Sequence, residues 1–217
     1  MQNPLNELPL LTSGRALSSA RAVTLLVHGR GRTPEEMIAL ADRFQLHEMA
    51  FLAPTAASGT WYPKSFLEPL DENQPHLDHA LDRLENLVSN LETKGFSRHR
   101  IAIVGFSQGA CLAAEYMDRH VERWGALALL TGGVIGPRAL ARDAGRRPAR
   151  DFRGTPMFFG CSDVDAWVPL DRVQATAELF TVLGAEVDLR VTPGMDHVIS
   201  DAQVEATRAL LEALLQR

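Results

Sequence analysis

Cysteine is scarce in this sequence, which has 217 residues and only Cys111 and Cys161. The two cysteines form no C-x-x-C pair and show no spacing typical of metal ligands. We therefore expect two reduced, partly buried thiols rather than a disulfide framework. No pattern in the sequence indicates a metal site or a bound cofactor.

Long apolar runs and a basic charge balance are also lacking. No stretch approaches the roughly 20 apolar residues that a membrane-spanning helix needs. The beginning of the chain, MQNPLNELPLLTSGRALSSA, has no basic region, and its apolar run is too short for a signal peptide. The formal net charge of −5 argues against binding to nucleic-acid phosphates. The sequence thus predicts a cytoplasmic protein with no membrane anchor and no nucleic-acid partner.

Neither an internal repeat nor a linker divides the chain, so we expect a single domain over residues 1–217. Apolar runs typical of strands cover residues 22–28, 49–53, 100–106, 124–131 and 155–160, and residues 186–192 (EVDLRVT) predict a further strand. Apolar residues at helical spacing cover residues 34–47, 76–94, 108–120, 169–183 and 200–217. This alternation predicts an α/β fold, a mostly parallel sheet with helices on both faces and no large separate cap domain.

Three segments fall outside this alternation. Residues 1–20 are expected to form an extended N-terminal segment. Residues 132–154 contain six arginines and predict an irregular excursion, for which a solvated insertion is favoured over a site for anionic substrates. Residues 54–75 contain four prolines and form a loop of a length that is usually functional or disordered. The aromatic side chains of this loop argue against disorder.

The 54–75 loop follows a strand and can therefore overhang a site at the carboxyl edge of the sheet. Its aromatic residues Trp61, Tyr62 and Phe66 would then shape a substrate pocket. A small satellite core beneath the loop is an equally good interpretation of the same three side chains.

Ser107 stands in the sequence GFSQG, a G-x-S-x-G motif between an expected strand and an expected helix. The glycines permit a sharp turn that exposes the serine hydroxyl above the sheet on strained backbone. The same turn places Ser107 at the start of a helix, where negative charge is favoured. The alternative is an ordinary N-cap serine.

A nucleophilic serine needs a base, and the base needs an orienting carboxylate. In this type of fold the chain order is Ser, then Asp or Glu, then His, and each partner lies just after a strand. The segment CSDVDAWVP offers Asp163 and Asp165, and PGMDHVIS offers His197. The order Ser107, Asp165, His197 fits. His197 could instead be an ordinary loop histidine.

The developing oxyanion also needs hydrogen-bond donors. One candidate is the backbone N–H of Gln108, the residue after the serine. The other is the backbone N–H of Arg30, in the loop His28-Gly29-Arg30-Gly31. We expect the Arg30 side chain to point to solvent. The alternative is a plain glycine-rich turn.

LVHGRG, GFSQGACLA, GCSDVDAWVP and PGMDH resemble the phospholipase/carboxylesterase family of α/β-hydrolases, which includes bacterial carboxylesterases and acyl-protein thioesterases. The resemblance extends from about Val23 to the C-terminus. It implies the α/β-hydrolase fold, Asp165 as the catalytic aspartate of a D-x-x-V-P element, and His197 as the base. Arg32 departs from the H-G-x-G-D pattern common in the thioesterases, and TWYPKSFLEPLDENQP looks like the corresponding segment of bacterial esterases.

These observations favour a serine carboxylesterase that hydrolyses small to medium acyl esters through an acyl-enzyme on Ser107. The alternative is an acyl thioesterase or lysophospholipase with the same triad. A more distant alternative is a non-catalytic binding protein on a hydrolase scaffold. The expected partner is a small-molecule ester, and the sequence leaves open whether the chain forms a homodimer.

Overall fold

The computed structural model describes residues 3–137 and 151–217. Its strands are β1 (Leu10–Gly14), β2 (Ala22–Val27), β3 (Met49–Pro54), β4 (Ile101–Phe106), β5 (Ala126–Leu130), β6 (Pro156–Ser162) and β7 (Glu186–Thr192). Its α-helices are α1 (Pro34–Phe44), α2 (His76–Thr93), α3 (Gln108–Arg119), α4 (Leu170–Val182) and α5 (Asp201–Leu215). Most of the 132–154 excursion lies outside the described residues.

The strands form one sheet in the order β1-β3-β2-β4-β5-β6-β7. The strand β1 pairs antiparallel with β3, and all other pairs are parallel. The central strands β2, β3 and β4 are buried along their whole length, as expected for a parallel sheet covered on both faces. The α/β fold predicted from the sequence is confirmed.

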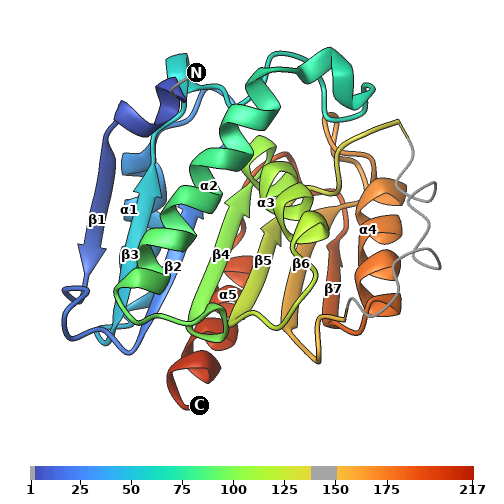
Figure 1. Ribbon diagram of the computed structural model, residues 1–217. Helices are drawn as coiled ribbons and strands as arrows, with labels where there is room; N and C mark the ends of the chain where they lie inside the picture. The colour runs from blue at the N-terminus through green and yellow to red at the C-terminus, as the bar shows by residue number, and fades with distance from the viewer. Residues whose placement is uncertain (1–2, 138–150) are drawn as a thin grey trace.

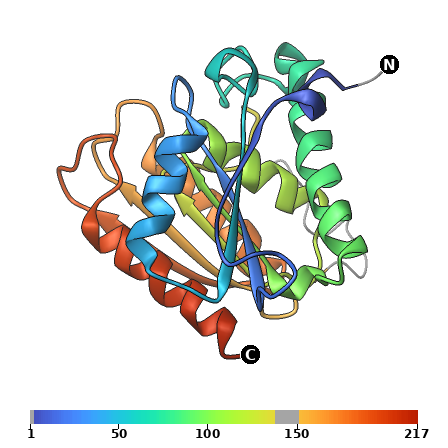
Figure 2. The same ribbon diagram turned by 90° about the vertical axis from the view of Figure 1, so that its left-hand side faces the viewer.

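Helices cover both faces of the sheet. Figure 1 shows α2, α3 and α4 in front of the strands, and Figure 2 shows α1 and α5 on the opposite side. Alternate residues of a strand point to opposite faces, so Leu129 of β5 joins the core under α2, α3 and α4, whereas Leu130 joins the core under α1 and α5. Each face therefore has its own apolar core.

The first segment contains structure that the sequence did not predict. Residues 1–20 were expected to be simply extended, but Pro4–Glu7 form a short 3-10 helix and Leu10–Gly14 form β1. The strand has two half-buried leucines followed by polar residues rather than a regular alternation. Its strand character comes from pairing with β3, which no local pattern could reveal.

Two helix starts set the position of the loops at the carboxyl edge of the sheet. Thr33 caps α1 by accepting a hydrogen bond from the Glu36 N–H, and Pro34 occupies the first turn. Ser200 and Gln203 form a capping box at the start of α5. Among the described residues, no helix has the length and apolar character needed to cross a membrane.

Candidate active site

Ser107 lies between the end of β4 and the start of α3, in a backbone conformation that L-residues rarely adopt. Its φ is 53° and its ψ is −120°. The Ser107 N–H donates to the carbonyl of Leu130 on the neighbouring strand β5, at 3.0 Å. The Ser107 carbonyl accepts from the Cys111 N–H at 3.0 Å. The surrounding backbone therefore stabilises the strained turn.

The glycines on either side of Ser107 permit close approach of backbone segments. A Cβ at Gly109 would lie 2.1 Å from the Val27 carbonyl oxygen, and one at Gly105 would lie 2.5 Å from the Gly109 carbonyl oxygen. Real Cβ atoms do not approach backbone so closely. The G-x-S-x-G pattern is thus required by the packing of α3 against β2 and β4.

Three of the predicted residues form a chain of hydrogen bonds. The His197 Nε2 lies 2.8 Å from the Ser107 Oγ, and the His197 Nδ1 lies 2.6 Å from the Asp165 Oδ2. Asp165 follows β6 and His197 follows β7, so all three side chains meet at the carboxyl edge of the sheet. This is the arrangement that nucleophile, base and orienting carboxylate require.

The Asp165 carboxylate is fixed from both sides. Its Oδ1 accepts hydrogen bonds from the backbone N–H groups of Trp167 and Val168, at 2.8 and 2.9 Å. Its side chain is 1% exposed. The neighbouring Asp163 instead accepts a hydrogen bond from the Gly194 N–H, which ties the β6–α4 loop to the loop that carries His197.

The two predicted oxyanion donors lie at the cavity beside Ser107. Within the described residues, neither the Arg30 N–H nor the Gln108 N–H has a hydrogen-bond acceptor. The side chains of Arg30 and Gln108 form hydrogen bonds to the 54–75 loop, which the sequence did not reveal. The Arg30 guanidinium, expected in solvent, donates to the carbonyls of Tyr62, Pro63 and Lys64 at 2.6–2.9 Å.

Gln108 binds the same loop from below. Its Oε1 accepts from the Trp61 N–H at 3.0 Å, and its Nε2 donates to the Tyr62 carbonyl at 2.8 Å. The side chains of both candidate oxyanion residues therefore hold the 54–75 loop over the site, while their backbone amides remain available.

His28 is a further residue that holds this loop by a hydrogen bond. It is fully buried, its Nδ1 lies 2.8 Å from the Gly29 carbonyl, and its Nε2 accepts from the Ala56 N–H. This pattern requires a neutral ring with the proton on Nδ1. Burial lowers the pKa of His28 below its ordinary value of 6.5.

The three aromatic residues of the loop are all buried in the core under α2, α3 and α4, and two of them also line the cavity. Tyr62 and Phe66 line the cavity at Ser107, and their role in substrate binding stays a prediction. Trp61 does not line it, and the prediction of a pocket role for Trp61 is corrected. Its indole N–H donates to the His28 carbonyl, and its ring packs 4.9 Å from the His28 ring. Trp61 thus belongs to the core beneath the loop.

The cavity beside Ser107 has a volume of about 610 Å³. Its lining residues come from four loops, from the end of β4 and from the turn into α3 and its first part: Gly29, Arg30, Arg32, Tyr62, Pro63, Lys64, Ser65, Phe66, Phe106, Ser107, Gln108, Cys111, Trp167, Val168 and His197. Trp167 and Val168 were not predicted as pocket residues, although they stand inside the D-x-x-V-P element. Their position two and three residues after Asp165 is the signal that could have indicated them.

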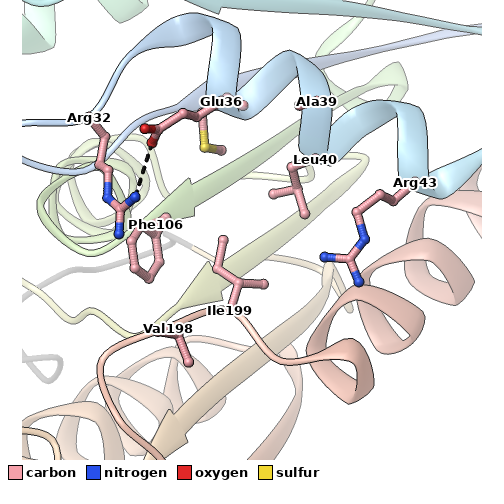
Figure 3. Close-up of a pocket in the computed structure, with 9 residues that line it drawn as sticks. Arg32, Glu36, Ala39, Leu40, Arg43, Phe106, Val198 and Ile199 are labelled. Carbon is pink, nitrogen blue, oxygen red and sulfur yellow. Dashed lines mark hydrogen bonds and ion pairs between the residues drawn. The ribbon is translucent and has the colours of Figure 1, made fainter.

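A second cavity of about 430 Å³ lies between α1 and the start of α5 (Figure 3). Leu40, Val198 and Ile199 form apolar walls, and Phe106 and Arg32 border both cavities. The Phe106 ring also packs 5.2 Å from the His197 ring. The second cavity therefore adjoins the site on the side away from the 54–75 loop.

Neither cysteine is disposed to react. Cys111 lies one turn along α3 from Ser107, as expected, and burial raises the pKa of its thiol to about 12. Burial also raises the pKa of Cys161 to about 11. Since the thiolate is the nucleophilic form, both cysteines are poor nucleophiles. In the described part of the chain, no group of three or more His, Cys, Asp or Glu side chains is arranged to hold a metal ion.

The mostly parallel sheet, the serine turn after β4 and the Ser-His-Asp hydrogen bonds are those of a serine hydrolase of the α/β class. A model of the Phospholipase/Carboxylesterase family matches residues 15–215, and the chain belongs to this family.

Similar proteins agree with this assignment. The phospholipase/carboxylesterase structure from Dyadobacter fermentans is 35% identical, with a TM-score of 0.88 over 95% of this chain and 97% of that one. Acyl-protein thioesterase 1 of Gibberella zeae is 24% identical over 221 residues, or 92% of this chain and 93% of that protein. The carboxylesterase structure from Mesorhizobium loti has the same fold, with 21% identity, a TM-score of 0.71 and 96% coverage of each chain.

Proposed function

We propose that this hydrolase is a serine carboxylesterase that cleaves small to medium acyl esters at Ser107. The observation that carries the proposal is the hydrogen-bonded chain from the Ser107 Oγ through His197 to the buried Asp165. The family assignment supports ester hydrolysis as the reaction class.

In the proposed mechanism, the Ser107 Oγ attacks the ester carbonyl carbon while the His197 Nε2 takes its proton. Asp165 holds the imidazole in the required tautomer and stabilises the imidazolium. The amides of Arg30 and Gln108 donate to the oxyanion. Collapse of the tetrahedral intermediate transfers the proton from His197 to the leaving alcohol, and the acyl group remains on Ser107. Water, deprotonated by His197, then releases the carboxylic acid and restores the serine.

The expected acyl length follows from the cavity. Tyr62, Phe66 and Val168 give it an apolar wall, and the loop above is held by the hydrogen bonds of Arg30 and Gln108. A cavity of about 610 Å³ accommodates a small or medium ester within the usual range for ligand pockets.

Hydrolysis of p-nitrophenyl esters with increasing acyl length tests the proposal. Turnover should be highest for short to medium chains, and Ser107→Ala should lower kcat on the order of 10⁴-fold or more. Asp165→Asn should lower kcat by a similar factor because the wrong tautomer of His197 becomes favoured. Ser18→Ala, a change at an exposed serine far from Ser107 in the sequence, is the control and should leave kcat unchanged. A folded and fully active Ser107→Ala protein would contradict the proposal. A folded wild-type protein that binds the esters without hydrolysing them would contradict it too.

A thioesterase with the same machinery is the second candidate, and similarity to Acyl-protein thioesterase 1 of Gibberella zeae favours it. Matched oxygen esters and thioesters of equal acyl length separate the two. A kcat/KM that is higher for the thioester at every length, or that rises steadily to long chains, would replace the carboxylesterase assignment.

A further inference from the structure

The cavity at Ser107 carries a local excess of positive charge. Arg30, Arg32 and Lys64 line it, and no aspartate or glutamate lines the part of it that the described residues form. The whole chain has the opposite balance, with a formal net charge of −5. Charges of one sign around a cleft attract ligands of the other sign and raise their local concentration.

The three cations differ in how they are held. The Arg30 guanidinium donates to three loop carbonyls, which fixes it as a positive charge in the cavity wall. One of these three carbonyls belongs to Lys64, and the Lys64 N–H donates to the Asn73 Oδ1 at 2.8 Å. The backbone of Lys64 is therefore anchored at the rim.

The Lys64 ammonium, in contrast, has no fixed partner. The residue is exposed, and within residues 3–137 and 151–217 it makes no ion pair. An ammonium on a flexible stem with an anchored backbone can meet a ligand charge without displacing a protein carboxylate.

Arg32 faces the same space from the β2–α1 loop. Its Cζ lies 5.9 Å from the centroid of the Phe106 ring, and the His197 ring lies 5.2 Å from that centroid. Figure 3 shows Arg32 next to Phe106 with its contact to Glu36. That ion pair is 3.4 Å long and both side chains are about half exposed, so it is weak and easily exchanged for a ligand anion.

We propose that the ester substrate carries an anionic group, a carboxylate or a phosphate, which Lys64 and Arg32 bind at the rim while the ester carbonyl lies at Ser107. This inference rests on the proposed function because it names the substrate class of the same site. Glu36 opposes the interaction by competing for Arg32.

The test compares three acetate esters: para-acetoxybenzoate, its neutral methyl ester, and para-acetoxyphenyl phosphate. Each kcat/KM is divided by the rate constant for hydroxide-catalysed hydrolysis of that ester, which removes differences in intrinsic reactivity. The anion preference is the ratio of an anionic ester to the neutral one. In the wild type it should be on the order of tenfold, as for one charge-assisted hydrogen bond, and should fall in high salt. The better of the two anionic esters identifies the preferred group.

Charge variants assign the preference to the two residues. The double variant Lys64→Met with Arg32→Gln should bring the ratio close to one. Lys94→Met removes one positive charge at the exposed end of α2, as the single change Lys64→Met does at the cavity, and should leave the ratio unchanged. Glu36→Gln should raise the ratio because it frees Arg32. A merely structural role of these side chains would alter both esters alike.

Binding to Ser107→Ala tests the inference independently of turnover. Trp167 is 72% exposed at the cavity, whereas Trp61 and Trp124 are buried, so its fluorescence reports occupancy, with Trp167→Phe as the blank. Tighter binding of para-acetoxybenzoate than of its methyl ester supports the proposal. Equal binding, or a wild-type ratio at or below one, overturns it. If the wild type still hydrolyses the neutral ester and Ser107→Ala does not, the proposed function stands even when the anion preference is absent. If the wild type hydrolyses none of the three esters, the proposed function is overturned, and the binding comparison still decides the anion preference.

Discussion

At the scale of single residues, Ser107 sits on backbone that costs about 1–3 kcal/mol to hold in such a conformation. The energy is offset by hydrogen bonds to β5 and α3 and by the tight packing of the flanking glycines. Strain of this kind persists only where the surroundings determine the backbone completely. The stability of the fold and the geometry of the site are therefore linked at the same few positions.

Gly109→Ala should destabilise the protein by at least about 3 kcal/mol, a large value for one methyl group. The added Cβ would meet the carbonyl oxygens of Val27 and His28, at 2.1 and 2.5 Å, and these backbone atoms cannot turn away. Gly31→Ala is the matched control, since nothing lies within 4 Å of its Cβ and only the positive φ, 69°, opposes the change. It should cost about 1 kcal/mol. Equal losses in urea unfolding would contradict this account.

Protonation of His28 should make stability depend on pH. The folded state holds the ring neutral, and burial lowers its pKa below 6.5. As the pH falls below about 6.5, the unfolded chain takes up a proton that the folded state refuses, so the free energy of unfolding decreases. Above that pH both states are neutral and the contribution of His28 is constant. His28→Gln should show a shallower decline between pH 7 and 5 in urea titrations, and parallel declines would refute the assignment.

At the scale of elements, the 54–75 loop is held by side chains from two other places in the fold and by one side chain of its own. Arg30 binds it from the β2–α1 loop, Gln108 from α3, and Asn73 from its own far end. Asn73 is fully buried, and its Nδ2 donates to the Ser65 carbonyl while its Oδ1 accepts from Lys64. The cavity wall thus depends on side-chain to backbone hydrogen bonds rather than on regular secondary structure.

Asn73→Ala should release this wall. Loss of both hydrogen bonds leaves backbone groups of Lys64 and Ser65 without their partners and should cost about 1–3 kcal/mol of stability. KM should rise several-fold, with a smaller change in kcat, because the side chain touches the substrate wall and not the reacting atoms. Asn90→Ala on the exposed side of α2 is the control. A lowered kcat at constant KM would place Asn73 in the chemistry instead.

The contrast between triad and loop explains how far the sequence could predict this site. Ser107 and Asp165 follow strongly apolar strands, and His197 follows the half-exposed strand β7. Parallel strands bring their carboxyl ends to one edge, so strand patterns and chain order, together with the family resemblance, were enough to predict these three residues. The burial of Trp61 against His28 and the grip of Arg30 on the loop depend on contacts between segments more than 30 residues apart. The strand β1 was missed for the same reason, because its strand conformation depends on pairing with β3 and not on a local sequence pattern.

At the scale of the whole molecule, one sheet separates two apolar cores. Trp61 and Trp124 lie in the core under α2, α3 and α4, while the core under α1 and α5 contains no tryptophan among the described residues. Each of the strands β2 to β6 contributes side chains to both cores, so we expect the two cores to be lost together. The triad depends on this coupling, because α3 follows Ser107 on one face and α5 follows His197 on the other.

Leu130→Ala tests the coupling. Leu130 is fully buried on the face of α1 and α5, and its truncation should cost about 2–5 kcal/mol. Tryptophan fluorescence reports the other face once the exposed Trp167 is replaced by Phe. If the two faces unfold together, the urea midpoint by fluorescence in this background should fall as far as the midpoint by far-ultraviolet circular dichroism. Leu129→Ala, its neighbour on the tryptophan face, should give the same coincidence. A fluorescence midpoint left unchanged in Leu130→Ala would mean that the faces unfold separately and that the serine could remain ordered after its histidine is lost.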